Sequence, residues 1–160
     1  MRGGWLPPAL LCAALAFALA FVPVRARLPA LILLGVAAAI TSLLPLHRVS
    51  PEIVFAGCWI SVALTAASVH LRPGRPVWFA PVIGVNAGLW AGAVIAISGT
   101  ALDLLRALPV ALIVLPAAWL VAHRGGIGVK VVASWLVAVA ILAGTLPIVP
   151  TPGYAPDHME

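Results

Sequence analysis

Long apolar runs separated by short polar gaps extend along almost the whole chain. A helix needs roughly 20 residues to cross the hydrocarbon core of a bilayer, and six runs come near that length: 6–24, 28–46, 51–70, 77–98, 107–122 and 129–148. Prolines stand at the start of several runs, where a first helical turn tolerates the missing N–H. We therefore predict an all-α polytopic membrane helical bundle with six transmembrane helices, forming a single integral membrane domain over 1–160 with an exposed tail at 150–160.

The composition also places this bundle in lipid. Of the 160 residues, 64% are hydrophobic and 8% are charged, whereas soluble domains are about 45–50% apolar and about 25% charged. Six spans leave only short loops and tails, so we expect no soluble catalytic or binding domain. The preference for arginine over lysine and the abundance of alanine fit a GC-rich bacterial genome.

Charged residues alternate from one polar gap to the next. The first, third and fifth gaps contain basic residues and no acid: Arg25, Arg27, Arg72, Arg75, Arg124 and Lys130. The second and fourth gaps and the two tails contain all four acids and the remaining three basic residues. Because short basic loops resist translocation and stay in the cytoplasm, this alternation predicts a multi-pass inner-membrane protein with both termini on the periplasmic, outer side.

The net charge of +5 has the same explanation. The basic residues are spread over three short loops rather than gathered on one soluble face, so we expect them to orient the chain in the lipid bilayer and not to bind nucleic acid. The stretch 18–20 resembles a signal-peptidase site, but cleavage there would leave Arg25 and Arg27 outside. We therefore expect the first helix to be retained.

Two halves of the chain, 1–76 and 77–149, share a sparse pattern. A W-x-x-P motif opens the first and fourth runs, L-P opens the second and fifth, and His-Arg precedes Trp59 and Trp135 at the same separation. One interpretation is a chance match between apolar strings. The other is a duplication, in which three spans per half place the copies in opposite orientations. That would be a 3+3 inverted repeat of the kind found in many transporters.

Small residues in the third and fourth runs predict close helix packing. Two sets recur at every fourth position: Gly84, Gly88 and Gly92 in the fourth run, and Gly57, Ser61 and Thr65 in the third. A four-residue step keeps small residues on nearly one helix face, where another backbone can approach closely. We expect the two stripes to contact each other, or the glycine stripe of the fourth run to form a homo-oligomer contact. A ligand channel is the weaker alternative.

Three residues are candidates for substrate contact. Asn86 is the only side-chain amide in a span, and an unsatisfied amide in hydrocarbon is strongly unfavourable, so it needs an interhelical partner, water or a substrate. Pro109 and Pro116 interrupt the fifth run. Broken helices expose backbone carbonyls with which transporters coordinate ions and substrates; an ordinary proline kink is the alternative.

The sequence shows no motif for catalysis, a cofactor or a metal. The spans carry no central carboxylate, and HExxH, GxSxG and Walker A patterns are absent. We therefore expect a protein that is not an enzyme and holds no cofactor or metal. The preferred hypothesis is a small permease or channel-like transporter of unknown substrate, with a homo-oligomer forming the pathway. The alternative is a non-catalytic accessory or assembly subunit that binds other membrane proteins in a larger complex.

Overall fold

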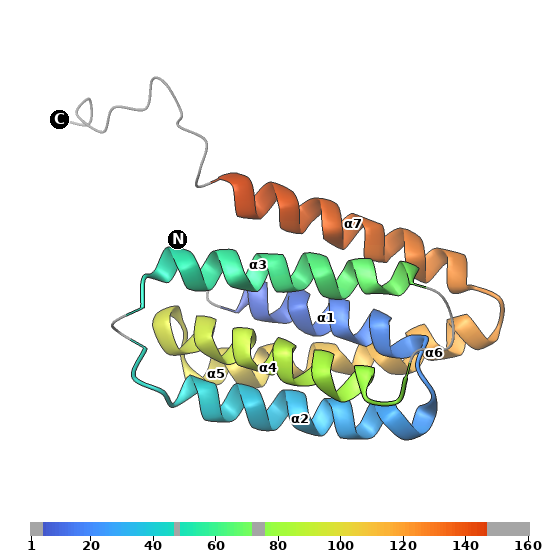
Figure 1. Cartoon of the computed structure of the whole chain (residues 1–160), viewed down its shortest axis with the longest axis horizontal. Coiled ribbons are helices and arrows are strands. Elements are labelled where there is room, and N and C mark those ends of the chain that lie inside the picture. Colours follow the sequence, from blue (N-terminus) through green and yellow to red (C-terminus); the bar gives the residue numbers. More distant parts are fainter. Residues whose placement is uncertain (1–4, 47–48, 72–75, 147–160) are drawn as a thin grey trace.

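The computed structural model describes residues 5–46, 49–71 and 76–146, and these residues fold into helices joined by short turns (Figure 1). The helices are α1 (Leu6–Ala20), α2 (Val24–Ser42), α3 (Pro51–Ala67), the 3₁₀ helix η1 (Ser68–His70), α4 (Phe79–Ser98), α5 (Ala101–Ala107), the 3₁₀ helix η2 (Leu108–Ile113), α6 (Val114–Ala122) and α7 (Gly126–Thr145). Within these described ranges, five stretches are long and apolar enough to cross a membrane by length and composition: α2, α3 with η1, α4, Ala101–Ala122 and α7. The protein is thus an all-helical bundle whose apolar helices indicate insertion in a membrane.

Helix α2 begins and ends earlier than expected. It begins at Val24, so Arg25 and Arg27 stand inside its first turns rather than in a loop before it. Pro23 sets this start, because its extended backbone (ψ 141°) leaves its carbonyl free to accept from the N–H of Ala26 at 2.9 Å. The expected tail at 150–160 and the basic residues Arg72 and Arg75 lie outside the described residues.

The fifth expected span is longer and less regular than its sequence suggested. It begins at Ala101 rather than near Ala107, and it passes from α5 through η2 to α6. Pro109 stands in the first turn of η2, where its missing N–H is least harmful. The proline therefore changes the helix type within the span and does not end it.

Successive long helices run in opposite directions, so the bundle has an up-and-down topology (Figure 1). α2 and α4 consequently run parallel, and they form the most extensive helix pair in the described structure. α7 packs on α3 in the antiparallel sense, with Gly144 beside Trp59 and Ser134 beside His70. Helices that lie far apart in sequence thus make the main contacts of the bundle.

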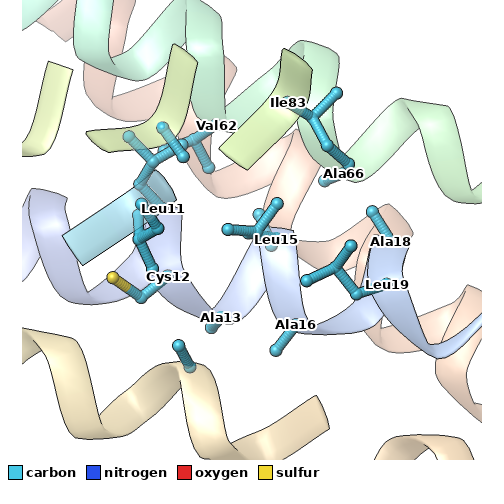
Figure 2. Packing of buried hydrophobic residues seen from close by; sticks show 14 of the residues in the cluster. Leu11, Cys12, Ala13, Leu15, Ala16, Ala18, Leu19, Val62, Ala66 and Ile83 are labelled. Atoms are coloured by element: carbon cyan, nitrogen blue, oxygen red, sulfur yellow. The ribbon is translucent and has the colours of Figure 1, made fainter. Parts of the chain in front are cut away.

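Helix α1 occupies the centre of this bundle. It contacts α3, α4, η2, α6 and, to a lesser extent, α5 and α7, and twelve of its fifteen residues are buried. Figure 2 shows Leu11 and Leu15 of α1 on the side of Val62, Ala66 and Ile83. A helix that is apolar on every side is suited to complete enclosure, and α1 has no charged residue along its length.

This central helix is also shorter in the structure than its expected range of 6–24. At about 1.5 Å per residue, its 15 residues extend about 22 Å, less than the ~30 Å of a typical hydrocarbon core. Neighbouring helices bury it from Pro7 onward, so most of its length meets protein rather than lipid. α1 corresponds to the first expected crossing and is too short to be counted with the five membrane-length stretches of the described residues, so the exact number of crossings stays a prediction.

The described charges separate toward the two ends of the bundle. The basic residues in the first turns of α2 lie at one end, together with Arg124 just before α7 and Lys130, which stands inside α7 rather than in the expected gap (Figure 1). Glu52 and Asp103, the two described acids, lie in the first turns of α3 and α5 at the other end, where one basic residue, Arg106, pairs with Asp103. The alternation along the sequence therefore becomes a difference in charge between the ends of the fold.

Part of the packing fits the inverted repeat. In such a repeat, α1 corresponds to α4, α2 to the fifth span, and α3 to α7. The contact between α2 and α4 then corresponds to the contact of η2 and α6 with α1, and the contact between α3 and α7 corresponds to itself. However, α1 packs along α3, whereas α4 and α7 make no comparable contact among the described residues. The two halves are therefore only partly alike, and the duplication stays a prediction.

Candidate functional site

One hydrogen bond between side chains joins two spans near their middles. The Nδ2 group of Asn86 in α4 donates to Ser61 Oγ in α3 at 2.5 Å. Ser61 is buried, whereas Asn86 is only half-buried. A carboxamide carries two N–H donors and one acceptor oxygen, and this bond uses one donor. The interhelical partner that the sequence analysis required for Asn86 is thus a hydroxyl of the neighbouring helix.

A groove of about 420 Å³ opens beside this hydrogen bond, between α3 and α4. It is lined by Ile53, Ala56, Gly57, Ile60, Ser61, Leu64, Asn86 and Trp90. A Cβ atom on Gly57 would lie within 2.7 Å of the Trp90 ring, so glycine at this position lets the indole lie directly on α3. The groove is therefore apolar, with a single amide and hydroxyl pair in its wall.

The glycine stripe of α4 faces α2. A Cβ atom on Gly88 would lie 2.5 Å from the carbonyl oxygen of Leu34, and one on Gly92 would lie 2.5 Å from that of Ala38. Gly84 meets the Ala30 carbonyl in the same way. We expected this stripe to contact the small residues of α3 or a second copy of the chain; the structure instead brings two helix backbones of one chain together along it.

The small residues of α3 contact a different face of α4. Gly57 lies under Trp90 and Ser61 accepts from Asn86, so they meet α4 away from its glycines. Thr65 is buried one turn further along, and its carbonyl oxygen accepts from the Ser68 hydroxyl at 2.6 Å. The two stripes are thus both used for packing, but not against each other.

The two prolines of the fifth span are not near Asn86 in the groove. η2, which contains Pro109, packs against α1. Pro116 lines a separate apolar groove of about 290 Å³ between α1, α6 and α7, together with Phe17 and Val129. The three residues that the sequence analysis grouped as substrate contacts therefore do not form one site.

Arg27 performs a structural role that its sequence context did not reveal. Its guanidinium Nε donates to the carbonyl oxygens of Leu19 at 3.1 Å and Val22 at 3.0 Å, and another guanidinium nitrogen donates to that of Ala20 at 3.2 Å. The last carbonyls of a helix lack intrahelical donors and carry partial negative charge. A cation from α2 thus caps the C-terminus of the enclosed helix α1.

The other described basic residues at this end have separate environments. Arg25 is exposed. Arg124 follows α6 in the left-handed region (φ 67°), where the N–H of Gly125 closes the helix on Leu120 O at 2.7 Å. The Lys130 ammonium lies 5.9 Å above the Phe21 ring centre, which favours a cation–π contact.

We expect Arg27→Gln to lower the free energy of unfolding by about 2 kcal/mol, because the loss of charged hydrogen bonds leaves helix-end carbonyls unpaired. Arg25→Gln removes the same charge from the same helix but touches no cap, so it should change the unfolding free energy by less than about 0.5 kcal/mol. Unfolding by SDS titration in mixed micelles measures both. Equal losses in the two variants would show that the cap contributes nothing.

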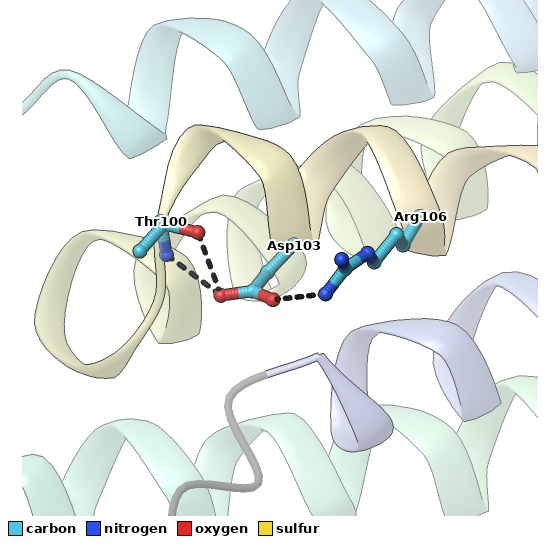
Figure 3. A network of polar contacts seen from close by, with 3 residues as sticks. All are labelled: Thr100, Asp103 and Arg106. Atoms are coloured by element: carbon cyan, nitrogen blue, oxygen red, sulfur yellow. Dashed lines mark hydrogen bonds and ion pairs between the residues drawn. The ribbon is translucent and has the colours of Figure 1, made fainter.

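A capping box begins the fifth span at the opposite end of the bundle. The Asp103 carboxylate accepts from the backbone N–H of Thr100 at 2.9 Å and from its hydroxyl at 3.0 Å, and Arg106 approaches the other carboxylate oxygen at 3.9 Å (Figure 3). The T-x-x-D spacing in the sequence is a known helix-start signal. It places this charged pair in helix initiation rather than in binding.

The described part of the chain offers little chemistry beyond packing. Cys12 and Cys58 are buried in the core, and His70 and His123 bond to Ser134 Oγ and to the Trp119 carbonyl, respectively. Within this part, His, Cys, Asp and Glu side chains form no group of three that could hold a metal ion. No family model matches the sequence, and no curated protein or solved structure matches it either.

Proposed function

We propose that this chain is a non-catalytic subunit of a membrane protein complex in a bacterial inner membrane. The observation that supports this role is the filled centre of the bundle. Leu11, Leu15 and Leu19 of α1 are fully buried there, where a transporter monomer would need a polar pathway. The grooves at α3–α4 and α3–α7 lie instead between neighbouring helices. A protein of this shape acts through its outer surfaces, by packing against other membrane proteins.

A small permease is the second candidate. Its support is the 3₁₀ stretch η2 inside a membrane-length helix, since irregular helices within spans often line ion or substrate sites. Because α1 fills the bundle centre, such a pathway would have to form between copies of the chain, beside the half-buried Asn86. The two candidates therefore differ in whether the purified chain alone moves solutes.

Extraction in a mild detergent tests the subunit role. The tagged chain, purified from the cells that make it naturally, is expected to migrate on a native gel in a complex containing other integral membrane proteins, identified by mass spectrometry. Reconstitution into liposomes gives the second measurement. Solute or ion flux above that of protein-free liposomes, from a chain that co-purifies with nothing else, would overturn the subunit role in favour of the permease.

We also propose that the basic end of the bundle faces the cytoplasm and that both termini lie outside. The support is that both described acids lie at one end with a single described basic residue, Arg106, whereas the other described basic residues lie at the opposite end, together with the tendency of basic loops to stay inside. Alkaline phosphatase fused after Glu160 should be active, whereas a fusion after Arg75 should be inactive and a cytoplasmic reporter there should be active. Phosphatase activity at Arg75 would contradict this orientation.

A further inference from the structure

We propose that a second copy of this chain docks into the α3–α4 groove, with the Asn86 side chains of the two copies hydrogen-bonded to each other across a two-fold axis. This inference rests on the placement of the bundle in a bilayer and goes beyond the subunit role. It names a partner for one particular surface, and the groove was not assigned to an oligomer contact by the sequence pattern.

The hydrogen bonding of Asn86 is incomplete within one copy. Asn86 is the only carboxamide residue in the chain, and its described bond to Ser61 leaves one N–H and the carbonyl oxygen of the side chain beside an apolar groove. Acyl chains can neither donate nor accept a hydrogen bond, and a polar group left without a partner in hydrocarbon is strongly unfavourable. The occupant of the groove should therefore bring both a donor and an acceptor to this depth.

A second copy of the chain meets this requirement. A carboxamide is its own complement, because the N–H of one amide can donate to the oxygen of the other in both directions. Two copies inserted in the same orientation are related by an axis along the membrane normal, which keeps equivalent residues at the same depth. Isologous contacts of this kind need a self-complementary surface, and Asn86 supplies it at the hydrogen-bonding level.

The shape of the groove is also self-complementary. On α3, the large side chains of Ile53, Ile60 and Leu64 are 63%, 59% and 68% exposed, and their spacings of seven and four residues place them on one stripe of the helix. Beside this ridge lies the small, exposed residue Ala56 of the groove. The ridge of one copy can thus enter the groove of the other, as in packing of helix ridges into helix grooves.

Association in liposomes tests this dimer. The full chain is labelled with donor and acceptor fluorophores, reconstituted into phosphatidylcholine liposomes over a range of protein-to-lipid ratios, and followed by energy transfer. The wild-type chain is expected to dimerise, and Asn86→Leu should weaken the association about tenfold, the size of effect seen for interhelical polar contacts in membranes. Asn86→Gln keeps the amide and should retain more of the association than Asn86→Leu.

Thr41→Val is the matched control. Thr41 is a buried polar residue of α2 whose hydroxyl oxygen has no hydrogen-bond partner in the described structure, and it faces Gly92 rather than the groove. Its replacement should leave the energy transfer of the dimer unchanged. Circular dichroism of each variant should show the helicity of the wild type, so that a loss of association cannot be caused by a loss of folding.

Cysteine cross-linking locates the interface independently. In a chain carrying Cys12→Ala and Cys58→Ala, Ile60→Cys should form a disulfide between copies on oxidation, whereas Leu28→Cys on the exposed face of α2 should not. A monomer at every ratio, or equal association of the wild type and Asn86→Leu, would overturn the proposal. A monomer that still co-purifies with other membrane proteins would overturn the dimer and leave the subunit role standing. A dimer that co-purifies with no other membrane protein would support the dimer and overturn the subunit role.

Discussion

Gly88→Ile is expected to separate α4 from α2 and to remove most of the folded protein from the membrane. A Cβ atom alone at this position would lie 2.5 Å from the Leu34 carbonyl oxygen and 2.7 Å from the Ala37 Cβ atom. Because these neighbours belong to the backbone and first side-chain atoms of α2, no rotamer change relieves the clash. We expect the free energy of unfolding to fall by about 3 kcal/mol or more, at the upper end of overpacking effects.

Gly35→Ile is the matched control on the partner helix. A Cβ atom on Gly35 has no atom within 4 Å, so the same substitution should be tolerated. It should even stabilise α2 slightly, since glycine is among the poorest residues in a helix interior. In-membrane fluorescence of a fused reporter gives abundance, and SDS titration gives unfolding free energy. Equal abundance and stability of the two variants would show that the α2–α4 contact is not close.

The helices could be predicted from the sequence because lipid imposes a minimum length and a composition on each span. Apolar runs of about 20 residues, bounded by prolines and charges, located α3, α4 and α7 to within a few residues. The start of the fifth span was missed because Thr100 and Asp103 were interpreted as polar gap residues. Their spacing was a capping signal, and it extends the helix through the charged residues to Ala101.

The partners of the helix faces could not be predicted. The spacing of Gly84, Gly88 and Gly92 indicates a face that allows close approach, but periodicity says nothing about which helix fills it. In the structure α2 packs against this face, and its small residues Ala30 and Ala38 let the two helix backbones approach closely. The small residues Gly57, Ser61 and Thr65 on α3 were an equally good match by sequence, and only the packing of the helices around one another decides between them.

The residues of the candidate site could be predicted from the sequence, but the hydrogen bond between them could not. Asn86 stood out because an amide in a span demands a partner, and Ser61 stood out because it is small. Their bond at 2.5 Å depends on the antiparallel register of α3 and α4, which no local pattern fixes. Arg27 shows the opposite case. Its charge suggested membrane orientation, whereas its hydrogen bonds to the last carbonyls of α1 and to Val22 in the following turn depend on the conformation of that turn.

The central position of α1 leads to the second large effect, which is expected for Leu15→Ala. Leu15 is fully buried among the helices that surround α1, and its truncation should lower the free energy of unfolding by about 3 kcal/mol. The physical reason differs from that in a soluble protein. Lipid tails are as apolar as leucine, so the transfer of a side chain contributes little, and the loss comes from the packing contacts around the new cavity.

Leu142→Ala separates these two contributions. Leu142 lies on α7 and is 64% exposed, so lipid can fill the space that its side chain leaves. We expect a change of less than about 0.5 kcal/mol in the same SDS titration. If truncation of Leu142 were as destabilising as truncation of Leu15, α1 would not be enclosed by protein in the membrane. The filled bundle centre would then no longer argue against a pathway through the monomer, and the subunit role would lose its main support.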